Sequence, residues 1–234
     1  MPALHLGIDE AGRGPVIGPL VLSGVWVRAE HRAKLRDLGV KDSKSFGSSG
    51  KAQKRRAQLA EQIRGMASCV VVLTVDAAEV SRRVRLGELN LLEQELAEVI
   101  VASGPPSLRI VADGARLFGP LCARHPQLRA LDRADVNHPC VAAASIVAKV
   151  ERDAQFHSIV ERFEAELGPI RGGGYVNDDT AAFLRAYFDR FGELPPDVRD
   201  SWNWPVLREL HRRRAGLPAV QPAEQLSLLE TEPS

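Results

Sequence analysis

The sequence has little cysteine, almost no net charge, and no long hydrophobic run. Its three cysteines, Cys69, Cys122 and Cys140, are scattered and odd in number, so we expect reduced thiols and no cysteine metal site. A formal net charge of +1 means that any nucleic-acid binding has to come from a local patch. Because no signal-peptide pattern or bilayer-length stretch occurs, we expect a cytoplasmic protein without a membrane partner.

What the 234-residue chain does contain is an alternation of short apolar runs and helical patterns, which favours an α/β sheet. The link between the first two apolar runs is too short for a parallel crossover, so we expect that pair to be antiparallel. We expect a basic, solvent-exposed helix over 51–66 and a buried strand over 69–75. The predicted strands are 4–9, 20–27, 69–75, 108–113 and, more weakly, 128–135, and the predicted helices are 51–66, 89–103, 140–167, 179–191 and 203–214.

The stretch "LHLGIDEAGRGPVIGPLVL" (4–22) places Asp9 and Glu10 where a strand ends, beside a glycine-rich turn. A dinucleotide-binding turn is disfavoured, because such a turn opens a helix and here a strand follows. A metal site is the alternative, since Asp113 and Asp135 also lie at the ends of predicted elements and divalent cations need several converging carboxylate oxygens. Each acid alone is as well explained by turn capping. Together the four acids favour a two-metal cage.

Five segments then carry a resemblance: "GIDEAGRGPVIGPLV", "GVKDSKSF", "VADG", "ADVNHPCVAAASIVAKVERD" and "GGGYVNDDTAAFLRAYF…GELPPDVRDSW". In this order they resemble the ribonuclease HII family over 4–214, and its archaeal and eukaryotic branch most closely. The resemblance implies an α/β fold, a ribonuclease H-like mixed β-sheet flanked by helices with a small C-terminal helical region. We expect a catalytic domain over 1–167, a substrate-binding helical region over 168–214, and a disordered tail over 215–234.

The same resemblance implies that Asp9, Glu10, Asp113 and Asp135 are the catalytic carboxylates and the ligands of two Mg²⁺ or Mn²⁺ ions. It implies a metal-dependent endoribonuclease that cuts the RNA strand of RNA–DNA hybrids and cuts 5′ of single ribonucleotides in duplex DNA. The products carry a 3′-hydroxyl and a 5′-phosphate, and the activity belongs to ribonucleotide excision repair and DNA replication.

Substrate contacts are implied at the turn and at a few side chains. By resemblance, Gly12, Arg13 and Gly14 recognise the 2′-hydroxyl, which distinguishes RNA from DNA, and Tyr175 packs on the next sugar. Phosphate contacts are expected from Lys44, Ser145 and Lys149. Asp153 follows Ser145 by about 12 Å of helix, so we expect it to pair with a Lys or Arg and not to bind metal. The basic run 51–56 is better explained as a solvated face, and His138, near Asp135, is the one histidine of interest.

Two rival functions remain open. Ribonuclease HIII is disfavoured because the turn has Arg13 and few residues precede the first strand, and a non-catalytic hybrid-binding module gains nothing from four acids facing phosphates. We expect a monomer.

The tail carries a separate signal. Its last part resembles the short peptide that binds the bacterial sliding clamp and indicates a bacterial host, although its leucines could also lack a partner. The residues concerned are Gln225, Leu226, Ser227, Leu228 and Leu229.

Overall fold

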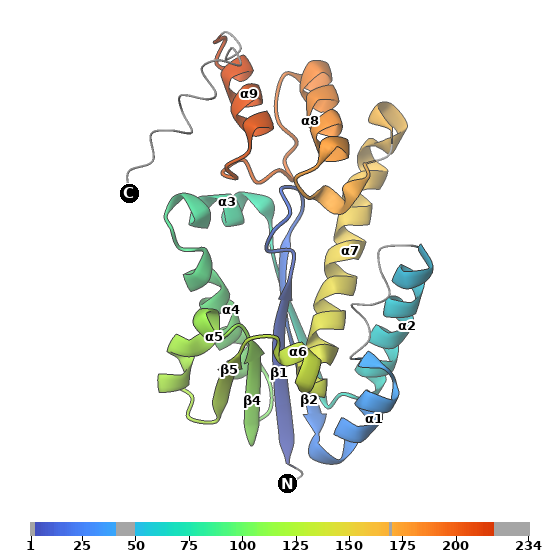
Figure 1. Ribbon diagram of the computed structural model, residues 1–234, viewed down its shortest axis with the longest axis vertical. Coiled ribbons are helices and arrows are strands. Elements are labelled where there is room, and N and C mark those ends of the chain that lie inside the picture. Colours follow the sequence, from blue (N-terminus) through green and yellow to red (C-terminus); the bar gives the residue numbers. More distant parts are fainter. Residues whose placement is uncertain (1–2, 41–49, 169, 218–234) are drawn as a thin grey trace.

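A five-stranded mixed β-sheet forms the centre of the molecule (Figure 1). The computed structural model describes residues 3–40, 50–168 and 170–217. The strand order is β3-β2-β1-β4-β5, with β1 antiparallel to β2 and parallel to β4. The expected antiparallel pairing of the first two strands is therefore confirmed. The strands are β1 (Leu4–Ala11), β2 (Leu20–Arg28), β3 (Cys69–Val75), β4 (Arg109–Asp113) and β5 (Leu128–Leu131).

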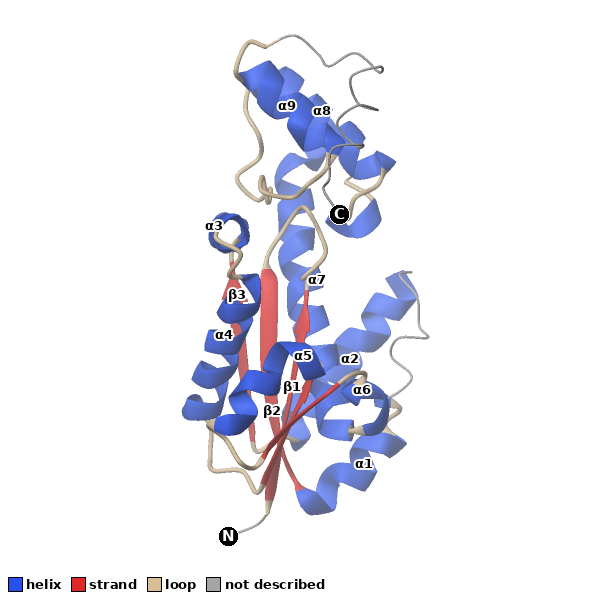
Figure 2. Cartoon of the chain, turned by 60° about the vertical axis from the view of Figure 1, so that its left-hand side comes forward, coloured by secondary structure: helices blue, strands red, loops and turns tan. Residues whose placement is uncertain are grey.

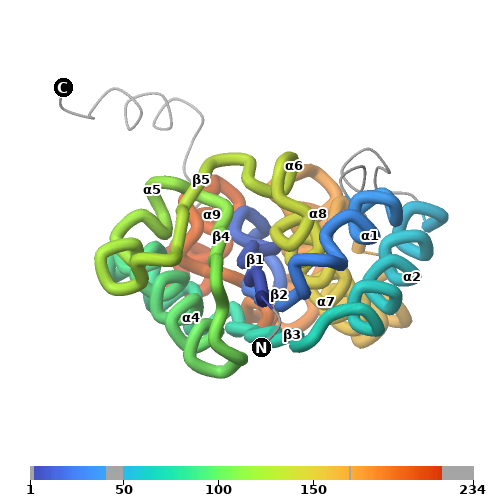
Figure 3. The backbone as a smooth tube through the Cα atoms, turned by 90° about the horizontal axis from the view of Figure 1, so that it is seen from below, coloured from blue at the N-terminus to red at the C-terminus, as the bar shows by residue number. Residues whose placement is uncertain are grey.

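Helices cover both faces of this sheet, as expected for an α/β fold of the ribonuclease H-like type (Figure 3). One face is covered by the long α7 (Pro139–Leu167), with α1 (Arg32–Asp37) and α2 (Gly50–Met66) beyond it. The other face is covered by α4 (Leu89–Ser103), preceded by α3 (Ala77–Arg85). Shorter segments are α5 (Ala115–Phe118), α6 (Ala134–Asn137) and the 3₁₀ turn η4 (Gly172–Gly174).

The start of α7 lies unusually close to β1, which its alanine-rich sequence permits. A Cβ atom on Gly7 would be 2.2 Å from the carbonyl carbon of Cys140, so only glycine fits there. On the neighbouring strand, the Ser23 hydroxyl donates a 2.7 Å hydrogen bond to the Ala144 carbonyl of α7. This close contact holds the first half of α7 directly over the strands that carry the candidate acids.

Above the sheet, the C-terminal helices α8 (Asp178–Phe191) and α9 (Pro205–Arg214) pack on the far end of α7 (Figure 2). They share one apolar cluster with Val16 and Ile17, which follow β1. Ile17 also forms an isolated antiparallel bridge with Val198. The predicted division into 1–167 and 168–214 stays a prediction. Most of the predicted tail, residues 218–234, lies outside the described residues.

Several predicted boundaries and exposures are wrong. The fifth strand ends at Leu131 and not at 135, because Arg133 has left-handed backbone (φ 54°) and the chain then turns into α6. The last helix begins at Pro205, two residues after its predicted start at 203. Strand β3 is only half-buried, because it is an edge strand.

The helix over 51–66 is also less exposed than predicted. Its Arg56 side chain is only 4% exposed, where a fully solvated basic face was expected. In the part of the chain that the structure describes, no helix has the length and apolar character to cross a bilayer.

Candidate active site

Three aspartates converge where the pairing between the parallel strands β1 and β4 ends. Asp9 and Glu10 lie inside β1, which continues to Ala11, so the predicted strand end at residue 9 is wrong. Because β1 and β4 are parallel neighbours, with Ile8 opposite Ala112, Asp9 and Asp113 emerge at the same edge of the sheet. Helix α6 brings Asp135 to this edge. One carboxylate oxygen from each of Asp9, Asp113 and Asp135 lies within 4.8 Å of the others, so the three side chains could hold one metal ion.

Local hydrogen bonds hold these acids in place. The Glu10 backbone N–H donates to Asp9 Oδ1 at 2.8 Å, and the side chain of Ser145 on α7 also hydrogen-bonds Asp9. The Ala134 backbone N–H donates to Asp113 Oδ1 at 3.0 Å, which ties the start of α6 to the end of β4. The turn that brings in Asp135 is therefore anchored on another acid of the cluster.

The electrostatics of the cluster favour a bound cation. Burial raises the pKa of Asp9 well above its ordinary value, and the neighbouring charges of Glu10 and Asp113 raise it further. Burial also raises the pKa of Glu10, whereas the positive charge of the Arg13 guanidinium lowers it. Glu10 Oε2 is buried and has no hydrogen-bond partner among the described residues. A divalent cation would neutralise these closely spaced negative charges, and the unpartnered Glu10 oxygen could serve as one of its ligands. The residues present therefore fit a metal ion.

The glycine turn after β1 has a fixed conformation. Gly12 has a φ of 87°, and a Cβ atom there would be 2.5 Å from the Pro19 carbonyl oxygen. The Arg13 guanidinium is paired with Glu93, and it donates a 2.6 Å hydrogen bond to Asn90 Oδ1. Both partners lie on α4, and the Glu93 side chain has no exposed surface. The arginine thus ties the turn to the helix below it.

The C-terminal segment after α8 supports the other side of this turn. The fully buried Arg199 donates from Nε to the Gly18 carbonyl (3.0 Å) and from Nη1 to the Arg13 carbonyl (3.1 Å). The Trp202 indole donates to the Gly14 carbonyl at 3.2 Å. Burial lowers the pKa of Arg199 to about 9, and the nearby positive charge of Arg152 adds to this shift.

Tyr175 lies directly beside the turn and is 46% exposed. Its ring is 3.6 Å from the position that a Cβ atom on Gly14 would take. The guanidinium carbon of Arg152 lies 5.6 Å from the centre of the Tyr175 ring, and Arg152 also donates to the Gly173 carbonyl. An exposed aromatic face beside a glycine turn is a surface on which a sugar or base can pack.

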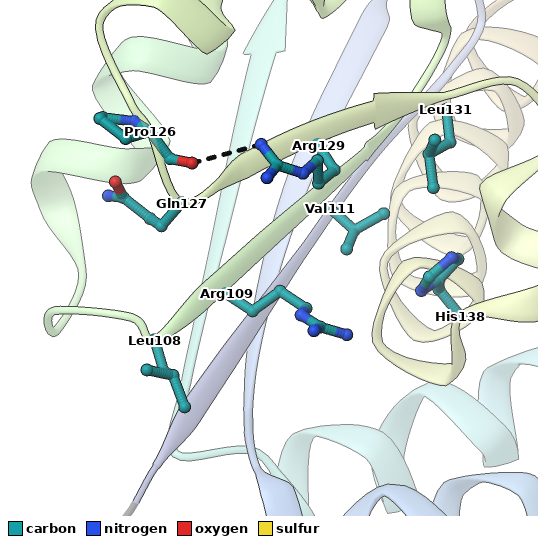
Figure 4. Close-up of a pocket in the computed structure, with 8 residues that line it drawn as sticks. All are labelled: Leu108, Arg109, Val111, Pro126, Gln127, Arg129, Leu131 and His138. Carbon is teal, nitrogen blue, oxygen red and sulfur yellow. Dashed lines mark hydrogen bonds between the residues drawn. The ribbon is translucent and has the colours of Figure 1, made fainter.

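Three other residues named in the sequence analysis, Lys149, Asp153 and His138, are also described by the structure. Lys149 is half-exposed and ion-paired with Asp153 at 3.2 Å. Asp153 also contacts Arg152 (3.2 Å) and Arg56 (3.9 Å), so its predicted pairing with basic residues is confirmed. His138 lines a depression whose lining includes no acid of the cluster (Figure 4). Lys44 and the tail residues 225–229 lie outside the described residues.

Sequence reasoning missed the residues that support the turn. Arg152 and Arg199 stand inside the quoted segments "AKVERD" and "DVRDSW", but nothing in either pattern shows that these arginines are buried. Glu93 was one of several charged residues in an apparently ordinary helix. Its burial follows from the packing of α4 under the turn, which local sequence does not reveal.

A mixed sheet of this order, with acids at the ends of its two central strands, defines the class of the protein as a nuclease with the ribonuclease H-like fold. The chain belongs to the ribonuclease HII family, whose model, described as Ribonuclease HII, matches residues 6–204. This membership makes it a ribonuclease H endonuclease, from a family that depends on divalent metal ions.

The relatives agree with this assignment. The ribonuclease HII of Methanothermobacter thermautotrophicus is 39% identical, over 84% of this chain and 95% of its own. That of Caldivirga maquilingensis is also 39% identical, over 86% of this chain and 92% of its own. The solved ribonuclease H2 of Pyrococcus horikoshii OT3 is 30% identical with a TM-score of 0.77, and the match covers 91% of this chain and 99% of the other. These archaeal relatives agree with the expected branch.

Proposed function

We propose that this protein cuts the RNA strand of RNA–DNA hybrids and cuts on the 5′ side of single ribonucleotides embedded in duplex DNA. The observation that carries the proposal is the convergence of Asp9, Asp113 and Asp135 within 4.8 Å in a ribonuclease HII chain. The products would carry a 3′-hydroxyl and a 5′-phosphate. Such an activity would serve ribonucleotide excision repair and the removal of RNA during replication.

Asp9, Glu10, Asp113 and Asp135 would hold two Mg²⁺ or Mn²⁺ ions. When bound, such ions activate water and stabilise the leaving oxygen of a phosphodiester. The protein's own contribution is placement. Ser145 orients Asp9 by a hydrogen bond, and the Ala134 N–H orients Asp113, so the carboxylate oxygens point at one position before substrate arrives.

Recognition of the ribonucleotide would come from the turn beside the acids. Gly12 and Gly14 leave backbone groups accessible next to the metal site, where a 2′-hydroxyl can hydrogen-bond. Tyr175 offers its exposed face to the adjacent sugar. Lys149, at the half-exposed edge of α7, and Ser145 would contact phosphates, and we propose the same role for Lys44.

The deciding experiment uses a DNA duplex with one embedded ribonucleotide, incubated with the protein and Mg²⁺ or Mn²⁺. One cut on the 5′ side of the ribonucleotide supports the proposal. Cutting only of longer RNA tracts supports ribonuclease HIII-like specificity, and binding without cutting supports a hybrid-binding module. The uncut duplex without metal is the matched control.

A sliding clamp is a proposed partner. One solved relative is described as the PCNA:RNase HII complex from Archaeoglobus fulgidus, and it is 35% identical with a TM-score of 0.70 over 86% of this chain and 96% of its own. The tail residues 225–229 supply a candidate docking peptide. That the clamp is bacterial rests on this tail alone.

Binding of the protein, which we expect to be a monomer, to purified bacterial clamp and to purified PCNA tests the partner proposal. Gln225→Ala with Leu228→Ala should abolish binding to whichever clamp the parent binds. If the double variant binds as well as the parent, the tail is not the docking peptide, and the nuclease proposal stands.

A further inference from the structure

A second feature lies on the same sheet face as the acids, over β4 and β5. It is a depression of about 450 Å³. Figure 4 shows the Arg109 guanidinium extending from β4 toward His138, while Arg129 extends from β5. The Arg129 guanidinium donates to the Pro126 carbonyl at 3.3 Å. The lining residues are Leu108, Arg109, Val111, Pro126, Gln127, Arg129, Leu131 and His138.

The depression carries positive charge and no carboxylate. A smaller neighbouring hollow shares Arg109 and His138 and adds Arg32 and His5, again without an acid. The side chains of Arg109 and Arg129 are both exposed, and neither forms an ion pair with another described residue. Burial, Arg32 and Arg109 all lower the pKa of His5 and of His138, which agrees with a local surplus of positive charge.

The geometry connects this depression to the candidate active site. Arg109, Val111 and Asp113 alternate along β4 and so lie on one face of the sheet, and Arg129 is paired with Val111 across the strands. Four residues of strand separate Arg109 from Asp113 by about 13 Å. Leu131 and His138 flank α6, the helix that carries Asp135. The depression therefore lies next to the acid cluster along the sheet.

We infer that Arg109 and Arg129 bind the sugar-phosphate backbone of the nucleic-acid duplex at a position beyond the one that is cut. The inference rests on the proposed function and extends it with a second phosphate-binding site. Guanidinium groups suit phosphate because their N–H groups can donate two parallel hydrogen bonds. A reach of about 13 Å corresponds to about four nucleotides along a duplex axis. The part of this sheet face over β4 and β5, which α7 leaves open, would thus bind the duplex to one side of the bond that is cut.

The test compares Arg109→Ala/Arg129→Ala with the parent protein on a long duplex with one central ribonucleotide. Loss of two phosphate contacts should raise the KM about tenfold without changing the kcat. With an all-DNA duplex, the slope of log affinity against log salt should fall by about 2. Arg109→Lys/Arg129→Lys keeps both charges and should retain the salt slope.

Three controls separate this effect from others. Lys51→Ala/Lys54→Ala removes the same charge from α2, which lies beyond α7 and away from β5 (Figure 3), and should leave the KM within twofold. Two shortened duplexes each end about three base pairs from the ribonucleotide, one on its 5′ side and one on its 3′ side. The effect of the arginine variant on the KM should differ between these two duplexes. The effect of the arginine variant should vanish for one of these two duplexes, because the shortened flank no longer reaches the site. An unchanged thermal midpoint checks the fold.

The outcomes are distinguishable. If the parent fails to cut the single-ribonucleotide duplex, the proposed function fails. If the parent cuts but Arg109→Ala/Arg129→Ala matches it, or loses no more affinity than the lysine variant does, only this inference is overturned. The depression would then be a candidate site for a protein partner. An equal loss on both shortened duplexes also overturns it.

Discussion

At the scale of single residues, Glu93 is a carboxylate inside the packed contact between α4 and the glycine turn. Its side chain has no exposed surface, and Arg13 is its cationic partner among the described residues. Removing one partner of a buried ion pair is strongly destabilising, because the other charge then stays buried and uncompensated. Arg13 therefore neutralises Glu93, in addition to the role predicted for it in the turn beside the acids.

Arg13→Leu should lower the free energy of unfolding by about 3–5 kcal/mol, because it leaves the Glu93 carboxylate buried without a cation. Arg13→Leu/Glu93→Leu should lose less than the single variant, since both charges are gone. Urea unfolding of the parent, both single variants and the double variant measures the coupling. A double variant that is less stable than Arg13→Leu would contradict the pairing.

Asp9→Asn should abolish cleavage and leave the fold intact. The raised pKa means that the folded chain binds a proton at Asp9 more tightly than the unfolded chain does. Without metal, stability should therefore fall as pH rises from about 4 through the raised pKa. Asp9→Asn should flatten this fall, and Mg²⁺ should raise the thermal midpoint of the parent more than that of the variant.

Thermal midpoints between pH 4 and 8, in EDTA and in Mg²⁺, measure both effects of Asp9→Asn. Asp37→Asn, at an exposed site on α1, is the matched control and should behave as the parent. Equal pH slopes for Asp9→Asn and the parent, or near-normal cleavage by the variant, would remove Asp9 from the proposed site.

Tyr175→Ala should raise the KM for a single-ribonucleotide duplex about tenfold, because the exposed ring face that would pack on the substrate is lost. Tyr175→Phe keeps that face and should stay close to the parent. Val176→Ala, an exposed neighbour, serves as the control. Equal KM values for the alanine variant and the parent would show that Tyr175 makes no productive contact.

At the scale of elements, the contact between β1 and α7 sets how closely the acid-bearing strand and the helix with Ser145 approach. Gly7→Ala should cost about 3 kcal/mol or more, because the new Cβ meets the backbone of α7, which cannot rotate away. Gly65→Ala on α2 has open space and should gain up to about 1 kcal/mol. Urea midpoints for the two variants should move in opposite directions.

Most elements and the acids of the site could be predicted from sequence, because strands with strong β-branched runs and long helices leave local patterns. The five strands and the antiparallel first pair were predicted in this way. The four-residue helix α6 has no such pattern, whereas α3 has one, an Asp76 N-cap before an amphipathic stretch, and was not predicted. Arg133, two residues after the end of the fifth strand, adopts left-handed backbone that its residue type does not predict.

The site shows the same limit. Asp9, Asp113 and Asp135 could be proposed because strand ends are visible in the sequence, and their convergence follows once β1 and β4 are neighbours. Glu93 and Arg199, which hold the glycine turn in place, could not be predicted from the sequence. Their burial depends on contacts between segments far apart in the chain, and no local pattern encodes that.

At the scale of the whole molecule, the apolar cluster of the C-terminal helices includes Val16 and Ile17 from the N-terminal part. We therefore expect the described chain to unfold in one transition. In Trp202→Phe/Trp204→Phe, the remaining Trp26 reports on the sheet, while in Trp26→Phe the other two report on the C-terminal region. In each variant the fluorescence and far-UV circular dichroism midpoints should coincide. Separate midpoints would instead show two independently folding parts.

The pairing of β1 with β4 and the support of the glycine turn by Arg199 and Trp202 have a consequence during synthesis on the ribosome. A nascent chain exposes Asp9 and Glu10 almost at once, but Asp135 follows only after most of the sheet has been translated, and Trp202 later still. At ordinary elongation rates of about 5–20 residues per second, reaching Trp202 takes about 10–40 s. Products that end before Asp135 would therefore lack both an acid of the proposed metal site and the support of the turn, so such a fragment could not cut nucleic acid in the cell that made it.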